Sequence, residues 1–355
     1  MVTLYAPVPH SVLDVVRCQQ TLELLSFSEA GLYSPASAIT YPIRDGLVFM
    51  GYDVHQHAFM EAVINEEREH QTSPEYFNRD LKFLRHSSVA VVDIINLLRR
   101  VQPFKTGMRA LEVGAGSGWV SWFFAQAGYD TWLCELEPNS LFVSWPYDHP
   151  HIGPGKRVVV DATLVPFGDH TFDLVVSKEF AHHVKAKAHL FSEVNRVLKQ
   201  GGILVLFEPV RSLWATLHYL RSPDPHTDHC IVWQAQYLKT IRRHGFRIVC
   251  DGAYAYERSG RLALLRRCRQ ACVESVRTGT PRNDLCTGFF QYLFGESLIV
   301  FASKEDDIPR HPRPRIQVVN PCQLRLTTAD REVYRPFVKV IRQAARGIIG
   351  EPAPT

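Results

Sequence analysis

The most constraining feature of the sequence is a glycine-rich turn that follows a short apolar run. Arg109–Val113 is expected to form a strand, Gly114–Gly118 the turn, and Trp119–Ala127 a helix that ends at Gly128. Glycines at alternate positions let the backbone turn tightly and let a ligand press against it. The helix that follows offers free N–H groups at its start. A strand–turn–helix unit of this kind predicts a binding site for a nucleotide-like ligand.

The spacing of the glycines separates two classes of cofactor. A dinucleotide fingerprint is GxGxxG and holds a pyrophosphate. Here the pattern is GxGxG, with Trp119 where the third glycine would stand. Glu112, which precedes the turn, is well placed to attract an ammonium group. The motif therefore favours a ligand that carries an amino acid and a sulfonium rather than phosphates.

Acidic residues follow the next two expected strands. Glu135 ends the strand Thr131–Glu135, about 20 residues past the glycines, where an acid accepts hydrogen bonds from ribose hydroxyls. Glu137 is a second candidate for that role. Asp161 follows the strand Arg157–Val160, where it can accept from an adenine amino group while Ala162 and its apolar neighbours contact the ring.

Short apolar runs alternate with helical patterns through the middle of the chain, which is typical of βαβ units in a parallel sheet. An amphipathic helix is expected over Leu190–Lys199, stopping at Gly201-Gly202. The remaining strands are expected at Phe172–Ser177, Ile203–Phe207, Phe246–Cys250 and Ser297–Ala302.

The order of these motifs resembles the class I methyltransferases that use S-adenosylmethionine (SAM), in the branch with ubiquinone-type and many small-molecule enzymes. The resemblance is close over residues 108–210 and loose over 230–303. It implies an α/β, Rossmann-like, seven-stranded and mostly parallel sheet with helices on both faces. SAM would lie across the carboxyl ends of the strands. The implied cofactor contacts are Glu112, Gly114, Gly116, Gly118, Glu135, Asp161, Ala162 and Ser177, the last beside the transferred methyl group.

Methyl transfer to a hydroxyl or an amine can also use a base. Candidates follow the fourth strand and should face the cleft: Glu179, His182 and His183. A structural role is the alternative for all three, and it is favoured for His183. Lys178 is expected to bind substrate. The same is expected of His226 and His229, which lie in a connection that can serve as a lid; a plain loop is the alternative for these two. None of these residues is predicted to bind a metal.

Four segments organise the chain. They are a small N-terminal domain at 1–54, a helical connector at 55–104, the methyltransferase domain at 105–303 and an extension at 304–355. Insertions are expected in the third segment at 211–230 and 253–295. Amphipathic patterns predict a helix over Arg258–Arg277 and a terminal helix over Thr328–Ile348.

The N-terminal segment carries a second resemblance. Tyr41-Pro42-Ile43-Arg44-Asp45-Gly46 is similar to the closing strand of Trm112-like zinc ribbons, which have two CxxC pairs before it. Here the pairs read Cys18-Gln19-Gln20-Thr21 and Ser34-Pro35-Ala36-Ser37. Hydroxyls are poor zinc ligands, so the resemblance implies a metal-free remnant used for packing or for shaping the substrate entrance.

Composition limits the function classes. With 46% hydrophobic and 21% charged residues the chain is globular rather than disordered, and no stretch is long and apolar enough to span a membrane. The eight cysteines are scattered, and Met1–His10 has no signal-peptide pattern, so a cytoplasmic location is expected. The protein is not expected to be inserted in a membrane.

Charge divides unevenly along the chain. Residues 1–210 hold 17 basic and 23 acidic side chains, whereas 211–355 hold 23 basic, 20 of them Arg, and 13 acidic. This favours an anionic partner or a basic solvated surface. The predicted activity is methyl transfer to an O, N or C atom of a small biosynthetic acceptor, with anionic and lipid-linked acceptors among the candidates. An RNA methyltransferase and a non-catalytic SAM-binding partner protein are the alternatives, and the oligomeric state is left open.

Overall fold

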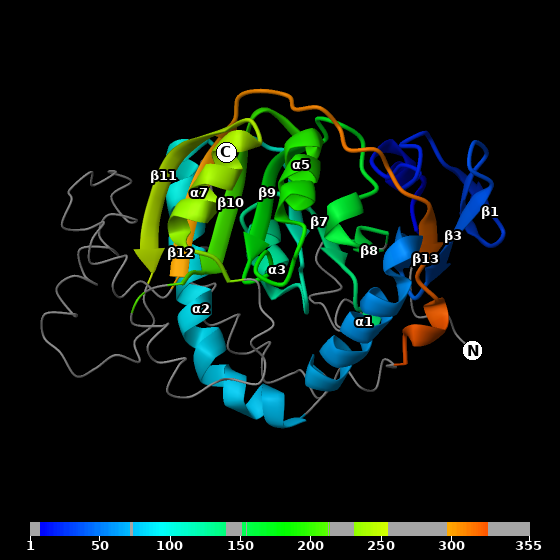
Figure 1. The fold of residues 1–355 in the computed structure, drawn as a ribbon, viewed down its shortest axis with the longest axis horizontal. Coiled ribbons are helices and arrows are strands. Elements are labelled where there is room, and N and C mark those ends of the chain that lie inside the picture. The colour runs from blue at the N-terminus through cyan, green and yellow to red at the C-terminus, as the bar shows by residue number, and fades with distance from the viewer. Residues whose placement is uncertain are drawn as a thin grey trace, which may run out of the picture.

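A central β-sheet organises the fold in the computed structural model, which describes residues 8–71, 74–139, 151–153, 155–211, 213, 231–254 and 297–325. Seven of its strands are neighbours in the order β8-β7-β6-β9-β10-β12-β11 (Figure 1). All pairs are parallel except those that β12 makes with β10 and β11. Their bounds are β6 Arg109–Val113, β7 Asp130–Glu135, β8 Arg157–Val159, β9 Phe172–Lys178, β10 Leu198–Pro209, β11 Phe246–Tyr254 and β12 Ser297–Lys304. The predicted seven-stranded, mostly parallel sheet is confirmed.

Helices cover both faces of this sheet. α5 (Lys187–Val197) and α7 (Gln234–Arg243) pack on one face together with side chains such as Leu111 and Val175. α2 (Pro74–Val101) and α3 (Trp119–Gln126) pack on the other, against side chains such as Ala110 and Val176. Neighbouring residues of one strand thus enter opposite clusters, as the two-residue period of a strand requires.

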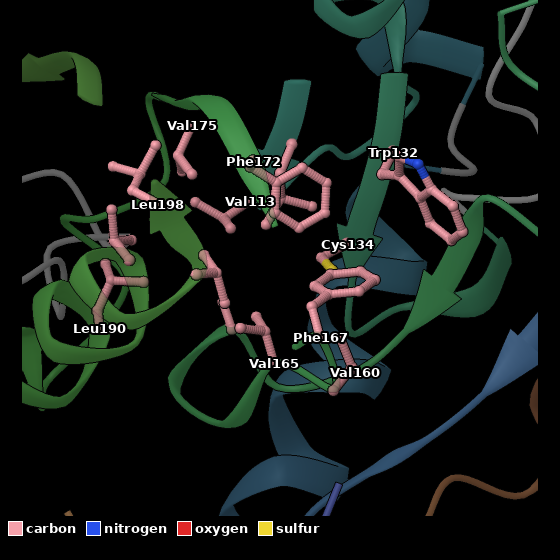
Figure 2. Close-up of a cluster of buried hydrophobic side chains, with 14 of the residues drawn as sticks. Val113, Trp132, Cys134, Val160, Val165, Phe167, Phe172, Val175, Leu190 and Leu198 are labelled. Atoms are coloured by element: carbon pink, nitrogen blue, oxygen red, sulfur yellow. The ribbon is translucent and has the colours of Figure 1, made fainter. Parts of the chain in front are cut away.

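The first of these clusters holds much of the aromatic core. Figure 2 shows Phe167 between Trp132 and Phe172, with Leu190 of α5 over the same face of the sheet. The rings of Phe167 and Phe172 meet edge to face, with centroids 5.0 Å apart. Trp132 belongs to β7 and Phe172 to β9, the two strands that flank β6, so this packing ties together three neighbouring strands. Both β7 and β9 carry predicted site residues at their carboxyl ends.

The sheet extends further than the predicted seven strands. Four strands of the N-terminal segment, β1 (Ser26–Ser28), β2 (Gly31–Ser34), β3 (Ile39–Arg44) and β4 (Leu47–Phe49), continue it to eleven. β4 lies parallel to β8. The reason is the apolar run Leu47-Val48-Phe49, which is fully buried and supplies backbone partners to an edge that would otherwise be open.

One predicted boundary is wrong. The helix expected over Leu190–Lys199 is α5, Lys187–Val197, and β10 begins at Leu198. Leu198 already pairs with Phe172 of β9, and the register shifts between Leu198 and Ile203, around Gly201 with φ +73°. Pairing with the neighbouring strand therefore overrides the helical pattern in the last residues.

The helical connector is formed by α1 (His57–Gln71) and α2, which meet where Pro74 starts the second helix. In Figure 1 the two helices form a V beyond the carboxyl ends of the parallel strands. Met60 and Ile64 of α1 share a buried cluster with Ala115 of the glycine-rich turn. The connector thus lies beside the predicted cofactor loop.

Residues 305–325 form a strap from β12 to the N-terminal segment. Its strand β13 (Ile316–Val318) pairs antiparallel with β5 (Gly51–Asp53), and the short helix η4 (Pro321–Gln323) follows. Within the described part of the chain, none of the helices has the length and apolar character that a membrane span needs. The expected helices at 258–277 and 328–348 lie outside the described residues, as do 253–295 beyond β11 and most of 211–230.

Candidate active site

The glycine-rich turn joins β6 to α3. Gly114, Gly116 and Gly118 have φ values of +69°, +50° and +68°, in the left-handed region that favours glycine. A Cβ on Gly114 would lie 1.9 Å from Cγ of Phe180, whereas a Cβ on Gly116 would meet nothing within 4 Å. The first glycine is therefore closed off by protein, and the second faces open space that a ligand can enter.

Glu135 links the end of β7 to this turn. Its Oε2 accepts a hydrogen bond from the Gly116 backbone N–H at 2.9 Å, and its Oε1 accepts from the Leu136 N–H at 2.7 Å. The carboxylate thus stands next to the open side of the loop. This is the place at which the ribose of a nucleoside would meet it.

Glu112 lies beneath the turn. It is 3% exposed, and its Oε2 accepts from the Ser121 backbone N–H at 2.8 Å and from the Ser121 hydroxyl. Burial raises the pKa of this carboxyl to about 8, against the lowering effect of Ser121. Glu112 therefore anchors the first turn of α3, and its contact with a ligand ammonium stays a prediction.

Asp161 follows β8 and is buried together with Ala162. Its Oδ1 accepts from the Thr163 backbone N–H at 2.8 Å and from the Thr163 hydroxyl at 2.9 Å. Its Oδ2 is buried and has no hydrogen-bond partner among the described residues. Burial also raises the pKa of this carboxyl. An unsatisfied buried acceptor is costly, so this oxygen is suited to a donor on a ligand, such as an amino group of adenine.

The carboxyl end of β9 carries a buried lysine. The Lys178 side chain is only 4% exposed, and its Nζ donates to Glu179 Oε2 at 2.7 Å. The same Nζ lies 5.2 Å from the ring centroid of Trp119 and 5.0 Å from that of Phe207. Glu179 has φ +52°, which is strained for a residue with a side chain. The chain therefore turns sharply here, with a paired cation held next to the start of α3.

Glu208, at the end of β10, was missed by the sequence analysis as a site residue. Its buried carboxylate accepts from the backbone N–H groups of Phe180, Ala181 and His182 at 2.9, 2.8 and 3.2 Å. The Ser177 hydroxyl lies 3.3 Å from Oε1. In the sequence, its position at the end of a predicted strand is the only sign of such a role. Its hydrogen-bond partners depend on how β9 pairs with β10.

His182 is brought to the same carboxylate. Its Nδ1 lies 2.8 Å from Glu208 Oε2, and the centroid of its ring lies 4.1 Å from that of His183. The structure thus gathers Ser177, Lys178, Glu179, His182 and His183 at the carboxyl end of β9. His226 and His229 lie outside the described residues. No cluster of three metal-binding side chains occurs among the residues that the structure describes.

The loop after β9 also reaches α1. Lys185 Nζ lies 4.6 Å from the ring centroid of Phe59, which α1 carries on its outer side with 42% exposure. α1 therefore crosses the carboxyl ends of the strands. It starts on the side of β8 and contacts the loop that follows β9. Side chains of α1 cluster with Ala115, and Phe180 of the loop lies against Gly114, so both elements contact the glycine-rich turn.

Comparisons with known proteins agree on the kind of domain. A family model described as a methyltransferase domain matches residues 111–206. An uncharacterized methyltransferase of Mycobacterium leprae is 32% identical over 189 residues, which cover 53% of this chain and 66% of that protein. One from Mycobacterium marinum is 35% identical over 101 residues, covering 28% and 38%. The chain thus spans less than two thirds of the length of these curated relatives.

Solved structures show partial likeness. A chain from a complex of the Haloferax volcanii Trm112 methyltransferase activator with a methyltransferase has a TM-score of 0.45 and 18% identity, covering 64% of this chain and 92% of that one. The Haemonchus contortus phosphoethanolamine N-methyltransferase 2 bound to SAM has a TM-score of 0.42 and 20% identity, covering 60% and 52%.

Proposed function

We propose that this chain, in which residues 111–206 form a class I SAM-dependent methyltransferase domain, transfers the methyl group of SAM to a small biosynthetic acceptor. The observation that carries the proposal is one edge of the sheet with three complementary features. They are the open space at Gly116, the Glu135 carboxylate bound to that loop, and the unpaired Oδ2 of Asp161. Each feature suits a different part of the cofactor.

The residues present fit SAM as follows. Glu135 would accept hydrogen bonds from the ribose hydroxyls, and Asp161 Oδ2 would accept from the adenine amino group, with Ala162 beside the ring. The turn with Gly116 and Gly118 would lie along the amino-acid part. When bound, SAM supplies a sulfonium whose methyl group is open to in-line attack. Alignment of the acceptor with this methyl group can then lower the activation barrier by about 7–11 kcal/mol, which is most of the expected rate acceleration.

The acceptor would meet residues from the end of β9. Ser177 is proposed to lie beside the transferred methyl group. Glu179, His182 and His183 are the candidates for removing a proton from a hydroxyl or amine acceptor, which is worth roughly 10²–10⁴-fold in rate. Lys178, which pairs with Glu179, is proposed to orient an anionic acceptor group. Anionic and lipid-linked acceptors therefore stay among the candidates, and the methylated atom is an oxygen, a nitrogen or a carbon.

The test is a calorimetric titration of the purified chain with SAM and with S-adenosylhomocysteine. The wild type is expected to bind both in the micromolar range, and Glu135→Ala is expected to abolish binding. Glu305→Ala is the matched control, because Glu305 lies far from the turn in a surface pair with Arg247. Absence of binding to the wild type, or full retention by Glu135→Ala, contradicts the proposed function.

An RNA methyltransferase is the second candidate, and the Arg-rich half of the chain after residue 210 favours it. Such a protein would shift RNA in a gel, and the affinity would fall steeply with salt. A non-catalytic SAM-binding subunit is the third. It would bind SAM in a stable complex with another protein and would transfer no methyl group.

The N-terminal segment is proposed to be a Trm112-like remnant. The thiol of Cys18 lies 3.3 Å from the Ser37 hydroxyl and 3.4 Å from that of Tyr41, and it also bonds to Ser34 and Thr21. Four positions that match a zinc ribbon's ligands thus converge, with one thiol among them. Burial raises the pKa of Cys18, but the surrounding hydroxyls outweigh it and lower the pKa to about 6.

We also propose a cytoplasmic location. Among the described residues, Cys18, Cys134 and Cys322 are free, which supports this proposal.

A further inference from the structure

A single carboxylate organises the loop that carries the candidate bases. Glu208 is fully buried at the end of β10. Three consecutive backbone N–H groups, those of residues 180–182, donate to it at 2.8–3.2 Å. We propose that Glu208 is a positioning residue for methyl transfer, which fixes the ring of His182 and holds the loop after β9 against the cofactor turn. The inference rests on the proposed function.

The two oxygens of the carboxylate have different partners. A buried carboxylate is costly unless donors surround it. Oε1 accepts from the N–H groups of residues 180 and 181 and from Ser177, whereas Oε2 accepts from the His182 N–H and has Nδ1 of the same residue as its second partner, at 2.8 Å. Because an ionised carboxylate only accepts, the proton of the neutral ring is placed on Nδ1, and the lone pair is on Nε2. Glu208 thus selects the tautomer in which Nε2 is the basic atom.

The same carboxylate also acts on the cofactor turn. Phe180, whose backbone N–H donates to Oε1, places its ring directly over the α-carbon of Gly114. The Ser177 hydroxyl lies 3.3 Å from that oxygen. Losing the carboxylate would release the backbone at residue 180 and so the ring that packs on the turn. Glu208 therefore connects the acceptor side of the site to the cofactor side, although it touches neither ligand.

The His182 tautomer reports the contact with Glu208 directly, and the affinity for S-adenosylhomocysteine reports its effect on the cofactor turn, so both are measured on the same variants. The full chain is labelled with 15N-histidine, and the ring nitrogens of His182 are assigned by comparison with His182→Gln. In the wild type, with S-adenosylhomocysteine present, we expect Nδ1 to be protonated. In Glu208→Gln we expect a mixture of both tautomers. We also expect affinity for S-adenosylhomocysteine to fall about ten-fold, because the loosened loop no longer holds the Phe180 ring against the cofactor turn.

Asp173→Asn is the matched control. Asp173 lies at the opposite end of β9, where it pairs with Lys199 at 2.8 Å and accepts from the Arg109 N–H at 2.9 Å. This variant should lower stability without changing the His182 tautomer or the affinity. An unchanged tautomer in a folded Glu208→Gln protein overturns the inference. If the wild type fails to bind S-adenosylhomocysteine but the tautomer changes as expected, the proposed function falls and the positioning of His182 stands.

Discussion

At the scale of single residues, two glycines of one motif have different tasks. Gly114 is closed off by the ring of Phe180, whereas Gly116 faces open space beside Glu135. The sequence pattern treats the two as equivalent, since both meet the need for a left-handed backbone. Their surroundings separate a glycine that packs against a ring from one that leaves room for the proposed ligand.

Substitution by alanine should separate these tasks. Gly116→Ala is expected to cost only about 1–2 kcal/mol in stability for its left-handed φ, but to weaken S-adenosylhomocysteine binding strongly because Cβ enters the ligand space. Gly114→Ala adds a clash with Phe180, for about 1–3 kcal/mol more. Thermal melts and calorimetry on both variants test this. Equal stability losses, or intact binding by Gly116→Ala, would count against the assignment.

Glu112 gives a pH dependence at the same scale. Its folded-state pKa is raised to about 8, above the ordinary value of 4.5, because the carboxyl is buried. A raised acid pKa means that the folded protein holds the proton more tightly than the unfolded chain does. Its contribution to stability is therefore full below about pH 4.5 and is lost as the pH rises through about 8.

Glu112→Gln removes this titration while keeping an acceptor for Ser121. Relative to the variant, the wild type is expected to lose free energy of unfolding between pH 5 and pH 8. Urea unfolding at several pH values measures the difference. A difference that stays constant with pH would show that Glu112 titrates alike in both states.

The residues that a motif could reveal were those at fixed distances from the glycines. Glu135 and Asp161 were predicted that way, because a strand end at a predictable spacing brings them to the edge of the sheet where we propose that the cofactor binds. Glu208 could not be found, because its role depends on which backbone amides the neighbouring strand presents to it. Sequence spacing along one strand does not carry that information.

At the scale of elements, local sequence patterns predicted where the strands lie better than which strands pair with each other. The seven strands appear where apolar runs indicated them. The end of α5 was wrong because Leu198 pairs with Phe172, a contact distant in sequence. The place of β4 beside β8 was missed for the same reason, since Leu47–Phe49 reads equally as a strand of a separate small domain.

The pairing of β4 with β8 predicts how the chain unfolds. Phe49 is fully buried and belongs to a cluster with Leu133 and Val159 of the methyltransferase domain. Phe49→Ala is expected to destabilise this shared core by about 3–5 kcal/mol. Because the core is shared, tryptophan fluorescence and far-ultraviolet circular dichroism should still report one coincident urea transition. Two separate transitions in the wild type would mean that the N-terminal strands fold on their own.

At the scale of the whole molecule, the strap joins three parts that are far apart in sequence. Arg313 donates to the carbonyl oxygen of Gln19 in the N-terminal segment, and it pairs with Glu193 of α5. Gln19 in turn bonds to both the N–H and the carbonyl of Gly51, at 2.7 Å each. Since the Gly51 carbonyl also accepts from the Asp161 N–H at 3.1 Å, the strap reaches the proposed adenine end of the site.

Two arginines on the strap provide the closing comparison. The Arg313 side chain is 9% exposed, and burial lowers its pKa to about 10. The Arg310 side chain is 60% exposed and pairs with Asp169 at the surface. Arg313→Ala breaks a buried pair and removes donors from Gln19 and Val165, so a loss of about 3–5 kcal/mol is expected. Arg310→Ala should cost at most about 1 kcal/mol.

The two variants should also differ in binding. Arg313→Ala frees the backbone of Gln19, whose side-chain amide holds Gly51. We therefore expect the affinity of this variant for S-adenosylhomocysteine to fall several-fold at a temperature where it is fully folded. Arg310→Ala should bind like the wild type. Urea unfolding and calorimetry on matched samples measure both effects. Of the two arginines, only Arg313 is connected to Asp161 through Gln19 and Gly51. Equal affinities of the two variants for S-adenosylhomocysteine would therefore mean that the strap stabilises the sheet without shaping the proposed cofactor site.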